Sequence, residues 1–216
     1  MSYWGKVKPG APAVRELPEL IITKASVGSM DNNAYLLRCR RTGEQVLIDA
    51  AADAETLLHL VGSDGLVTVV TTHRHRDHWQ ALSDVVAATG ASTVAGAPDV
   101  EGIPVATTTA VDDGDTVSVG TCDLRVITLV GHTPGSIALL YDDPEGTPHL
   151  FTGDSLFPGG PGKTSGADAF ASLMNDLESK VFGRLPDETW VYPGHGKDTT
   201  LGSERPHLAE WRARGW

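Results

Sequence analysis

Short apolar runs bounded by turn residues dominate the chain and predict a protein rich in β-strands. Runs at 20–23, 33–38 and 45–48 are separated by short glycine-containing turns, which is the pattern of an antiparallel meander. A run of mostly β-branched residues at 66–71 predicts a buried strand. Further strands are expected at 92–95, 117–119, 124–130, 137–141, 149–152 and 190–192.

Four segments instead repeat apolar residues at the helical period, and they predict helices at 53–61, 79–89, 167–182 and 203–212. Asp53 and Ser203 are the expected N-caps of the first and the last. Strands and helices alternate without an internal linker, which indicates an α/β protein with a single domain over residues 19–216. Residues 1–18 are expected to form an N-terminal arm, because three prolines there discourage a helix.

Composition and charge argue against several function classes. The 216-residue chain has 28 acidic and 17 basic residues and a formal charge of −11, so no nucleic-acid partner is expected. No continuous apolar segment suits a signal peptide or a membrane span, so we expect a cytoplasmic protein that does not bind membranes. Cys39 and Cys122 lack a CxxC spacing, and we expect reduced core residues rather than a disulfide. The sequence leaves the oligomeric state open.

The most distinctive polar stretch follows the predicted strand at 66–71. His73, His75, Asp77 and His78 place four potential metal ligands within six residues. In an extended segment, His73 and His75 point to one side and are able to bind one metal together. Asp77 and His78 come after the strand and are able to reach a second point a few ångströms away, as a two-metal site requires. A polar loop rich in histidine by chance is the alternative, which this clustering disfavours.

Three more potential ligands each follow a predicted strand and a glycine: His132, Asp154 and His195. Five of the eight histidines therefore lie at strand ends, an arrangement that random placement rarely produces. The other three, His59, His149 and His207, are expected to be surface or hydrogen-bonded structural residues.

In type and order, seven residues of the chain resemble the ligand set of the metallo-β-lactamase superfamily: His73, His75, Asp77, His78, His132, Asp154 and His195. The resemblance implies a four-layer αββα sandwich of two mixed sheets with a metal centre at one edge. It implies a first metal on His73, His75 and His132, and a second on Asp77, His78 and His195. Asp154 and a water or hydroxide would bridge the two. Nitrogen and oxygen ligands suit two zinc ions, while iron or manganese accept the same ligands.

Within the superfamily, the chain is most similar to glyoxalase II-like thioester hydrolases. The stretch at 151–163 resembles their passage from the bridging Asp to a glycine-rich loop with a basic residue. That resemblance makes Lys163 the candidate anchor for a carboxylate of the thiol carrier, with an ordinary solvated lysine as the alternative. Asp154 distinguishes the chain from true β-lactamases, which usually lack it.

Three features depart from the glyoxalase II pattern. Trp79 follows the Asp-His pair, where a small residue is usual, and it either narrows the pocket or packs into the core. Residues 164–166 lack the aromatic side chain that often contacts glutathione. The chain ends about twenty residues after His195, so the long helical C-terminal domain of larger glyoxalase II enzymes is not expected. The thiol carrier is therefore open between glutathione, mycothiol, bacillithiol and coenzyme A.

The sequence thus predicts an enzyme acting on a small molecule. It would be a dinuclear metal-dependent hydrolase of a small acyl thioester, in which a metal-bridging hydroxide attacks the carbonyl and Asp77 orients it. The alternative is a persulfide dioxygenase, which shares the fold and uses one iron held by two His and one Asp. A lactonase or phosphodiesterase comes next. A purely binding role is disfavoured, because every residue that generates the nucleophile is present.

Overall fold

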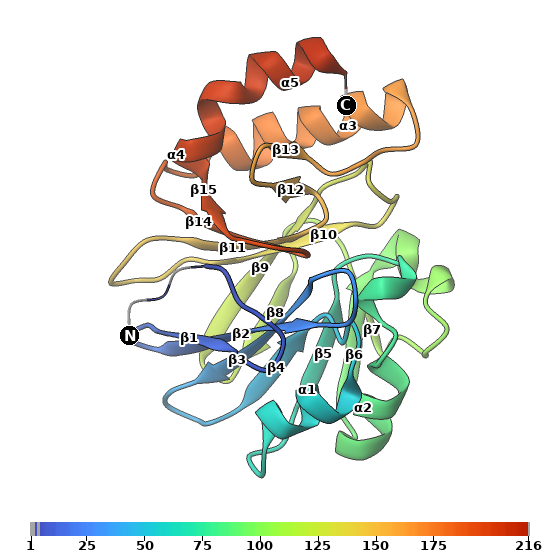
Figure 1. The fold of residues 1–216 in the computed structure, drawn as a ribbon, viewed down its shortest axis with the longest axis vertical. Coiled ribbons are helices and arrows are strands. Elements are labelled where there is room, and N and C mark those ends of the chain that lie inside the picture. Colours follow the sequence, from blue (N-terminus) through green and yellow to red (C-terminus); the bar gives the residue numbers. More distant parts are fainter. Residues whose placement is uncertain (1–2, 4, 216) are drawn as a thin grey trace.

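The strands form two sheets that pack face to face, with helices on both outer sides (Figure 1). The computed structural model describes residue 3 and residues 5–215. Positions 1, 2 and 4 of the predicted arm therefore lie outside the described residues. The first sheet contains, in spatial order, β1 Ala13–Glu16, β2 Leu20–Val27, β3 Asn32–Cys39, β4 Gln45–Ile48, β5 Thr68–Thr71, β6 Ser92–Gly96 and β7 Thr109–Val111. The second contains β15 Thr199–Thr200, β14 Trp190–Pro193, β11 His149–Gly153, β10 Ile137–Tyr141, β9 Cys122–Thr128 and β8 Thr116–Val119. A small ribbon pairs β12 Leu156–Phe157 with β13 Gly160–Pro161.

The first sheet begins as the predicted antiparallel meander and continues as a parallel sheet. Strands β1 to β4 pair antiparallel, whereas β4 to β7 pair in parallel. Parallel neighbours need a crossover connection, and the helices α1 (Ala54–Val61) and α2 (Leu82–Thr89) lie in two of these connections. The sequence pattern missed β1 and β7, because each has only three or four residues and few buried apolar side chains.

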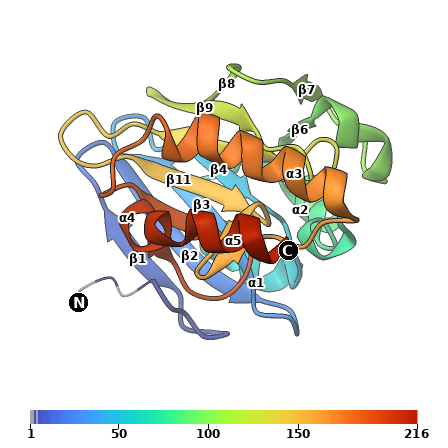
Figure 2. The same ribbon diagram turned by 90° about the horizontal axis from the view of Figure 1, so that it is seen from above.

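The second sheet is mainly antiparallel, with β11 and β14 as its parallel pair. Its outer face is covered by α3 (Ala167–Asp176), which continues as a π-helical segment to Phe182, and by α5 (Leu208–Arg214), as Figure 2 shows. The short helix α4 (Leu201–Glu204) and a 3-10 turn lead into α5. None of the helices among the described residues combines the length and apolar character needed to cross a membrane.

The helix starts agree with one of the two predicted caps. The Asp53 carboxylate accepts a hydrogen bond from the Thr56 N–H at the start of α1, as predicted. Ser203 is not a cap, because the terminal helical region begins earlier, at Leu201, and the Thr200 hydroxyl accepts a hydrogen bond from the Ser203 N–H. Both residues carry short hydroxyl side chains, so the position of the backbone turn decides which one caps the helix.

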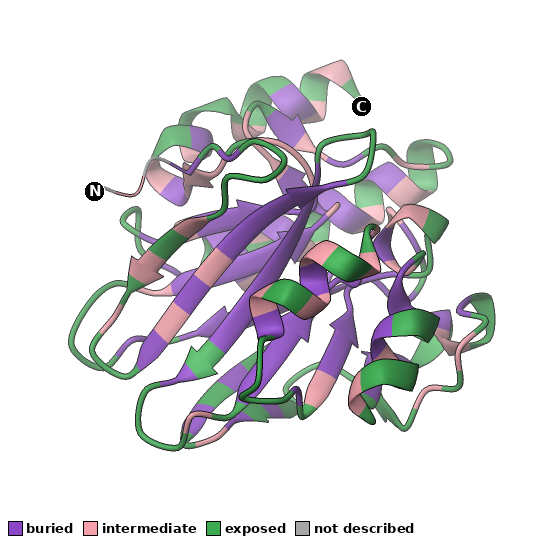
Figure 3. Cartoon of the chain, turned by 60° about the horizontal axis from the view of Figure 1, so that its bottom comes forward, coloured by how far each residue is buried: buried purple, intermediate pink, exposed green. Residues whose placement is uncertain are grey.

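Three apolar clusters separate four layers. The central cluster fills the space between the sheets and includes Leu37 and Leu124. A second, with Leu57 and Leu82, lies between the first sheet and the helices α1 and α2, and Figure 3 shows the buried strands beneath these half-exposed helices. A third joins the second sheet to α3 and α5, where Trp211 is buried. These layers confirm the predicted αββα sandwich of two mixed sheets.

One edge of the sandwich gathers the carboxyl ends of the parallel strands. In the first sheet β4 and β5 are parallel, and in the second β11 and β14 are parallel. Loops after parallel strands emerge at one edge of a sheet, which is where α/β proteins place their ligands. His73, Asp154 and His195 all lie in loops that follow these strands.

Candidate metal centre

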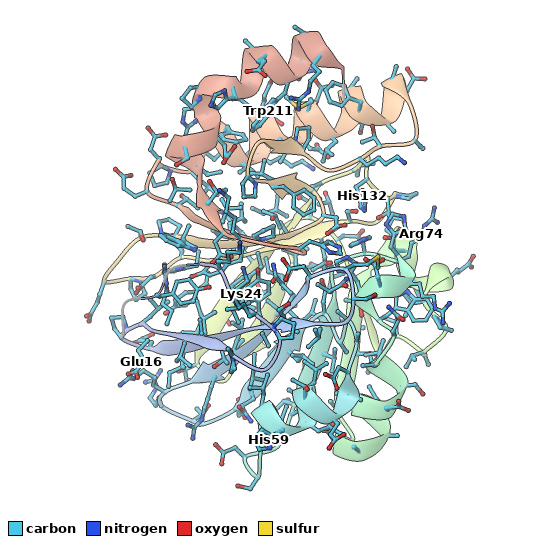
Figure 4. All side chains as sticks on the ribbon, viewed as in Figure 1. Glu16, Lys24, His59, Arg74, His132 and Trp211 are labelled. Atoms are coloured by element: carbon cyan, nitrogen blue, oxygen red, sulfur yellow. The ribbon has the colours of Figure 1, made fainter. Side chains whose placement is uncertain are left out.

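Seven His and Asp side chains from both sheets converge at this edge in three overlapping groups. The groups are His73, His75 and His132; His73, His78 and Asp154; and Asp77, His78 and His195, each with ligand atoms within 4.8 Å of one another. The structure thus brings together all the residues that the sequence singled out as metal ligands. Figure 4 labels His132 and Arg74, which come from loops of the second and the first sheet and lie at this edge.

The first ligand group, His73, His75 and His132, consists of imidazoles alone. His132 Nε2 lies 2.9 Å from His75 Nδ1 and 3.3 Å from His73 Nε2. His73 is buried just after β5, whereas His75 is exposed and His132 is half-buried. Three imidazole nitrogens around one point match a set that zinc binds in catalytic sites.

The second ligand group, Asp77, His78 and His195, adds a carboxylate. His195 Nε2 lies 3.2 Å from Asp77 Oδ2 and 3.3 Å from His78 Nε2. Asp77 and His78 belong to a 3-10 turn, and the Asn32 amide donates to the Asp77 carboxylate over 3.1 Å. That hydrogen bond keeps the carboxylate close to the two imidazoles.

Asp154 lies between the two ligand groups. Its Oδ2 is 3.6 Å from His132 Nε2 and 3.5 Å from His195 Nε2, and its Oδ1 is 3.4 Å from His78 Nε2. Oδ1 is buried and has no hydrogen-bond partner. A buried carboxylate oxygen without a partner is costly, and a cation beside it would satisfy it. The donor set therefore fits divalent metal ions.

Hydrogen bonds to the outer nitrogens orient three of the imidazoles. The Nδ1–H groups donate as follows: His78 to the Asp49 carboxylate over 2.8 Å, His132 to the Lys163 carbonyl over 2.6 Å, and His195 to the Met30 carbonyl over 2.9 Å. Because carboxylate and carbonyl oxygens only accept, each bond places the proton on Nδ1 and leaves Nε2 free to bind a metal.

Asp49 is a supporting residue that the sequence analysis missed. Besides the hydrogen bond from the His78 imidazole, Asp49 accepts hydrogen bonds from the N–H and the hydroxyl of Thr72. The hydroxyl oxygen of Thr72 lies 3.1 Å from His73 Nδ1. Its φ of 59° is uncommon for a residue with a side chain. Asp49 follows β4 directly, so the search for polar residues at strand ends that found the ligands would also have found it.

Asp99 is a second buried carboxylate that the sequence analysis missed. It accepts hydrogen bonds from the N–H groups of Arg74 and Gly135 and from the Thr133 hydroxyl. Arg74 lies in the histidine-rich loop and Thr133 follows His132, so Asp99 ties the two loops of the first ligand group together. Asp99 lies three residues after β6, beyond Ala97 and Pro98, in a segment whose sequence indicates only turns.

The two ligand groups differ in their affinity for protons. Burial, followed by the nearby His78, lowers the pKa of His73 well below its ordinary value. Burial also opposes the charge on His78, but Asp49 and Asp154 outweigh it and raise its pKa to about 10. Burial raises the pKa of Asp154, but the adjacent His195 and His78 imidazoles outweigh it and leave the pKa far below its usual range. Without a metal, protons at the second ligand group therefore balance the carboxylates.

Lys163 and Trp79 contact the centre through their neighbours. Lys163 is exposed, and its backbone carbonyl accepts the hydrogen bond from His132. Trp79 packs against the cluster beneath α1 and α2, and its indole N–H donates to the Arg74 carbonyl over 2.8 Å. Of the two interpretations of Trp79, the structure supports core packing.

The remaining histidines lie outside the metal-ligand groups. His59 is in α1, and His207 is in the turn before α5. His149 is buried at the start of β11, where its Nδ1 lies 2.9 Å from the Tyr192 hydroxyl and its Nε2 has no partner. Burial lowers the pKa of His149 to about 4, so this imidazole is neutral at pH 7.

Two packed sheets with helices on both outer faces, and His and Asp ligand groups at one edge, define a class of metal-binding αββα proteins. A sequence model described as the metallo-beta-lactamase superfamily matches residues 27–195, and the chain belongs to this superfamily.

Relatives with names and solved structures refine this assignment. The hydroxyacylglutathione hydrolase of Rhodospirillum rubrum is 36% identical over 167 residues, which cover 76% of this chain and 62% of the relative. The crystal structure of ETHE1 from Myxococcus xanthus has a TM-score of 0.76 at 29% identity, covering 87% of this chain and 82% of that one. TTHA1623, solved in a di-iron-bound form, has a TM-score of 0.68 at 32% identity. The match covers 84% of this chain and 96% of that one. The predicted similarity to glyoxalase II-like proteins is confirmed, although the chain spans less than two thirds of the first relative.

Proposed function

We propose that the protein is a metal-dependent hydrolase that binds two divalent metal ions and cleaves a small acyl thioester. The observation that carries the proposal is the place of Asp154 between two ligand groups, with a buried oxygen that lacks a partner. The similarity to a hydroxyacylglutathione hydrolase supports a thioester as the substrate class.

The seven residues divide between two metal positions. The first metal would be held by His73, His75 and His132. The second would be held by Asp77, His78 and His195, and Asp154 would contact both metals. We propose zinc, because imidazole nitrogen and carboxylate oxygen are among its usual protein ligands. Iron and manganese accept the same donors, and the di-iron-bound neighbour makes iron the first rival.

Bound metals of this kind lower the pKa of a coordinated water and polarise a carbonyl group. Asp77, which Asn32 holds in place, orients the attacking water as well as binding metal. Lys163 is exposed on the loop whose backbone positions His132, and its ammonium group would attract a carboxylate of the thiol carrier. Glutathione, mycothiol, bacillithiol and coenzyme A all remain open as that carrier.

Elemental analysis and a thioester assay test the proposal together. Protein purified without added metal is analysed for zinc, iron and manganese, and then assayed against S-lactoylglutathione and an acyl-CoA, with and without chelator. About two metal ions per chain and chelator-sensitive thioester cleavage are expected. No cleavage of these two substrates, or of mycothiol and bacillithiol thioesters, by protein carrying both metals would contradict the thioester assignment.

Substitution of Lys163 tests the anchor separately. Lys163→Ala is expected to raise KM for the carboxylate-bearing thioester and leave kcat nearly unchanged, because the charge contributes to binding alone. Lys8→Ala removes another exposed lysine and serves as the matched control. Equal KM values for the two variants would assign Lys163 the role of an ordinary surface lysine.

The second candidate is the mononuclear iron persulfide dioxygenase, to which the likeness to ETHE1 from Myxococcus xanthus gives weight. One iron per chain, no thioester cleavage and oxygen consumption with a persulfide substrate would favour it over the hydrolase.

A further inference from the structure

Cys39 and Cys122 lie far from the metal centre. Strand β3 begins at Asn32, which bonds to Asp77, and ends at Cys39. At about 3.3 Å per residue, β3 carries the chain roughly 20 Å away from the ligands. Cys122 begins β9 in the other sheet, and both cysteines belong to the cluster between the sheets. Each sheet therefore contributes one thiol to this part of the core.

The two thiols meet at one corner of the sandwich. Cys39 Sγ lies 3.4 Å from the hydroxyl of Thr121, the residue directly before Cys122. Cys122 Sγ lies 3.6 Å from the carbonyl of Glu19, which precedes Leu20, the cross-strand neighbour of Cys39. The Cys39 thiol is also close enough to Cys122 to raise the pKa of that thiol. They are therefore direct neighbours, although the chain between them is long.

Gly120 allows this approach. It lies in the turn between β8 and β9 with a φ of +60°, and a Cβ there would be only 2.9 Å from Cys39 Sγ. A side chain at this position would be strained and would push the turn away from β3. The turn that presents Cys122 thus packs directly on Cys39.

The environments make the two thiols chemically unequal. Burial raises the pKa of Cys39, but hydrogen bonds from Thr121 and Thr42 outweigh it and lower the pKa to about 6. Burial and the neighbouring Cys39 raise the pKa of Cys122 to about 11. Cys39 is therefore the more acidic thiol and the better nucleophile of the two.

A cavity of about 460 Å³ opens beside Cys122, with Thr121, Cys122 and Tyr141 among its lining residues. The Tyr141 hydroxyl is buried and has no hydrogen-bond partner. A small polar oxidant such as hydrogen peroxide fits this cavity, whose lining also includes the polar side chains of Thr121 and Asp123. The cavity therefore brings a small oxidant to Cys122 and to Thr121, whose hydroxyl lies against Cys39 Sγ, although both thiols are buried.

We propose that Cys39 and Cys122 form a redox-active pair, which a peroxide oxidises to a disulfide that links the two sheets. The Cys39 thiolate attacks one peroxide oxygen, breaking the O–O bond and forming a sulfenic acid and hydroxide. Cys122 sulfur then attacks Cys39 sulfur and expels the sulfenic oxygen, which leaves as water with the Cys122 proton. The two sulfur atoms together lose two electrons, and the peroxide is reduced to water and hydroxide.

Peroxide treatment of the wild-type protein as purified tests the pair without any substitution. After treatment, the chain is denatured, alkylated and digested. Both free thiols are expected to be lost, with a peptide pair joined through Cys39 and Cys122 and no dimer. The oxidised chain should melt roughly 5–10 °C higher, because the bond closes a long loop, and dithiothreitol should reverse the shift. Analysis of peptides is needed because Met30 is exposed and also gains oxygen from peroxide.

Cys122→Ser provides the matched comparison. In this variant Cys39 has no partner, so we expect oxygen addition at Cys39 in place of the linked peptide, and no gain in melting temperature. Two alkylatable thiols after treatment of the wild type, or disulfides only between separate chains, would overturn the proposal. The metal centre takes no part in these outcomes, so they are independent of the hydrolase assignment.

Discussion

The two ligand groups of the metal centre are held in different ways. In the first, His73 and His132 have neutral oxygens at their outer nitrogens, the Thr72 hydroxyl and the Lys163 carbonyl. In the second, the outer nitrogen of His78 bonds to the carboxylate of Asp49, and Asp77 adds its own negative charge. A carboxylate behind an imidazole raises its basicity and strengthens it as a metal ligand.

This difference indicates that the first group depends on geometry and the second on charge. The first consists of imidazoles on two separate loops, and Asp99 ties those loops together. The second is attached to a buried ion pair, because Lys24 Nζ donates to the Gly196 carbonyl, next to His195, and to the Asp198 carboxylate. The following substitutions test this contrast, beginning with the residue that both groups share.

Asp154→Ala should have the largest effect, because it removes the ligand shared by both groups. We expect turnover to fall at least about a thousandfold and metal content to fall below two ions per chain. Elemental analysis and steady-state kinetics measure both. Asp142→Ala removes an exposed carboxylate and is the control. Turnover near the wild-type rate in Asp154→Ala would disprove its bridging role.

Lys24→Met should have the largest effect on stability. The side chains of Lys24 and Asp198 are both fully buried, 2.6 Å apart, so the substitution leaves a buried carboxylate without its cation. Such a loss costs about 3–5 kcal/mol, which urea unfolding measures, and the second group should bind metal more weakly.

The double variant Lys24→Met/Asp198→Leu should recover part of the lost stability, because neither charge then remains buried. Equal stability of wild type and Lys24→Met would show that the pair does not support the loop of His195.

Asp49→Asn should weaken the second group more than the first, because Asp49 contacts His78 directly and His73 only through Thr72. The amide keeps the shape of the side chain but removes the charge behind His78, so we expect metal affinity or activity to fall by about 10–100-fold. Titration with zinc should show a larger loss of affinity at one of the two sites than at the other. Asp53→Asn changes an exposed helix cap and controls for the same substitution elsewhere.

Asp99→Asn should have the smallest effect of the four. Asp99 contacts no imidazole and acts through the Arg74 N–H, the Thr133 hydroxyl and the Gly135 N–H. Weakening these bonds costs about 1 kcal/mol, so we expect a loss of activity no greater than roughly tenfold, with the first metal position affected. A larger loss than in Asp49→Asn would reverse the contrast between the groups.

Local patterns were sufficient for most of the fold. The meander, the helix capped by Asp53 and the strand before His73 all depend on neighbouring residues, and the structure contains them. The patterns failed where few residues carry the signal, as in β1 and β7, and where Thr200 and Ser203 offered equivalent caps.

The partners of the supporting residues were beyond the reach of local patterns. Asp49 meets His78 across 29 positions, and Lys24 meets Asp198 across 174. A buried hydrogen bond or ion pair between such distant positions leaves no mark on the sequence around either partner.

By itself, the sequence determined which residue types stand at the strand ends, because short-range periodicity and turn chemistry place strands and loops. Only the tertiary structure decided that Asp154 lies between the two ligand groups and that Asp49 stands behind His78. Those distances result from packing one sheet on the other, which brings loops from both sheets to a single edge.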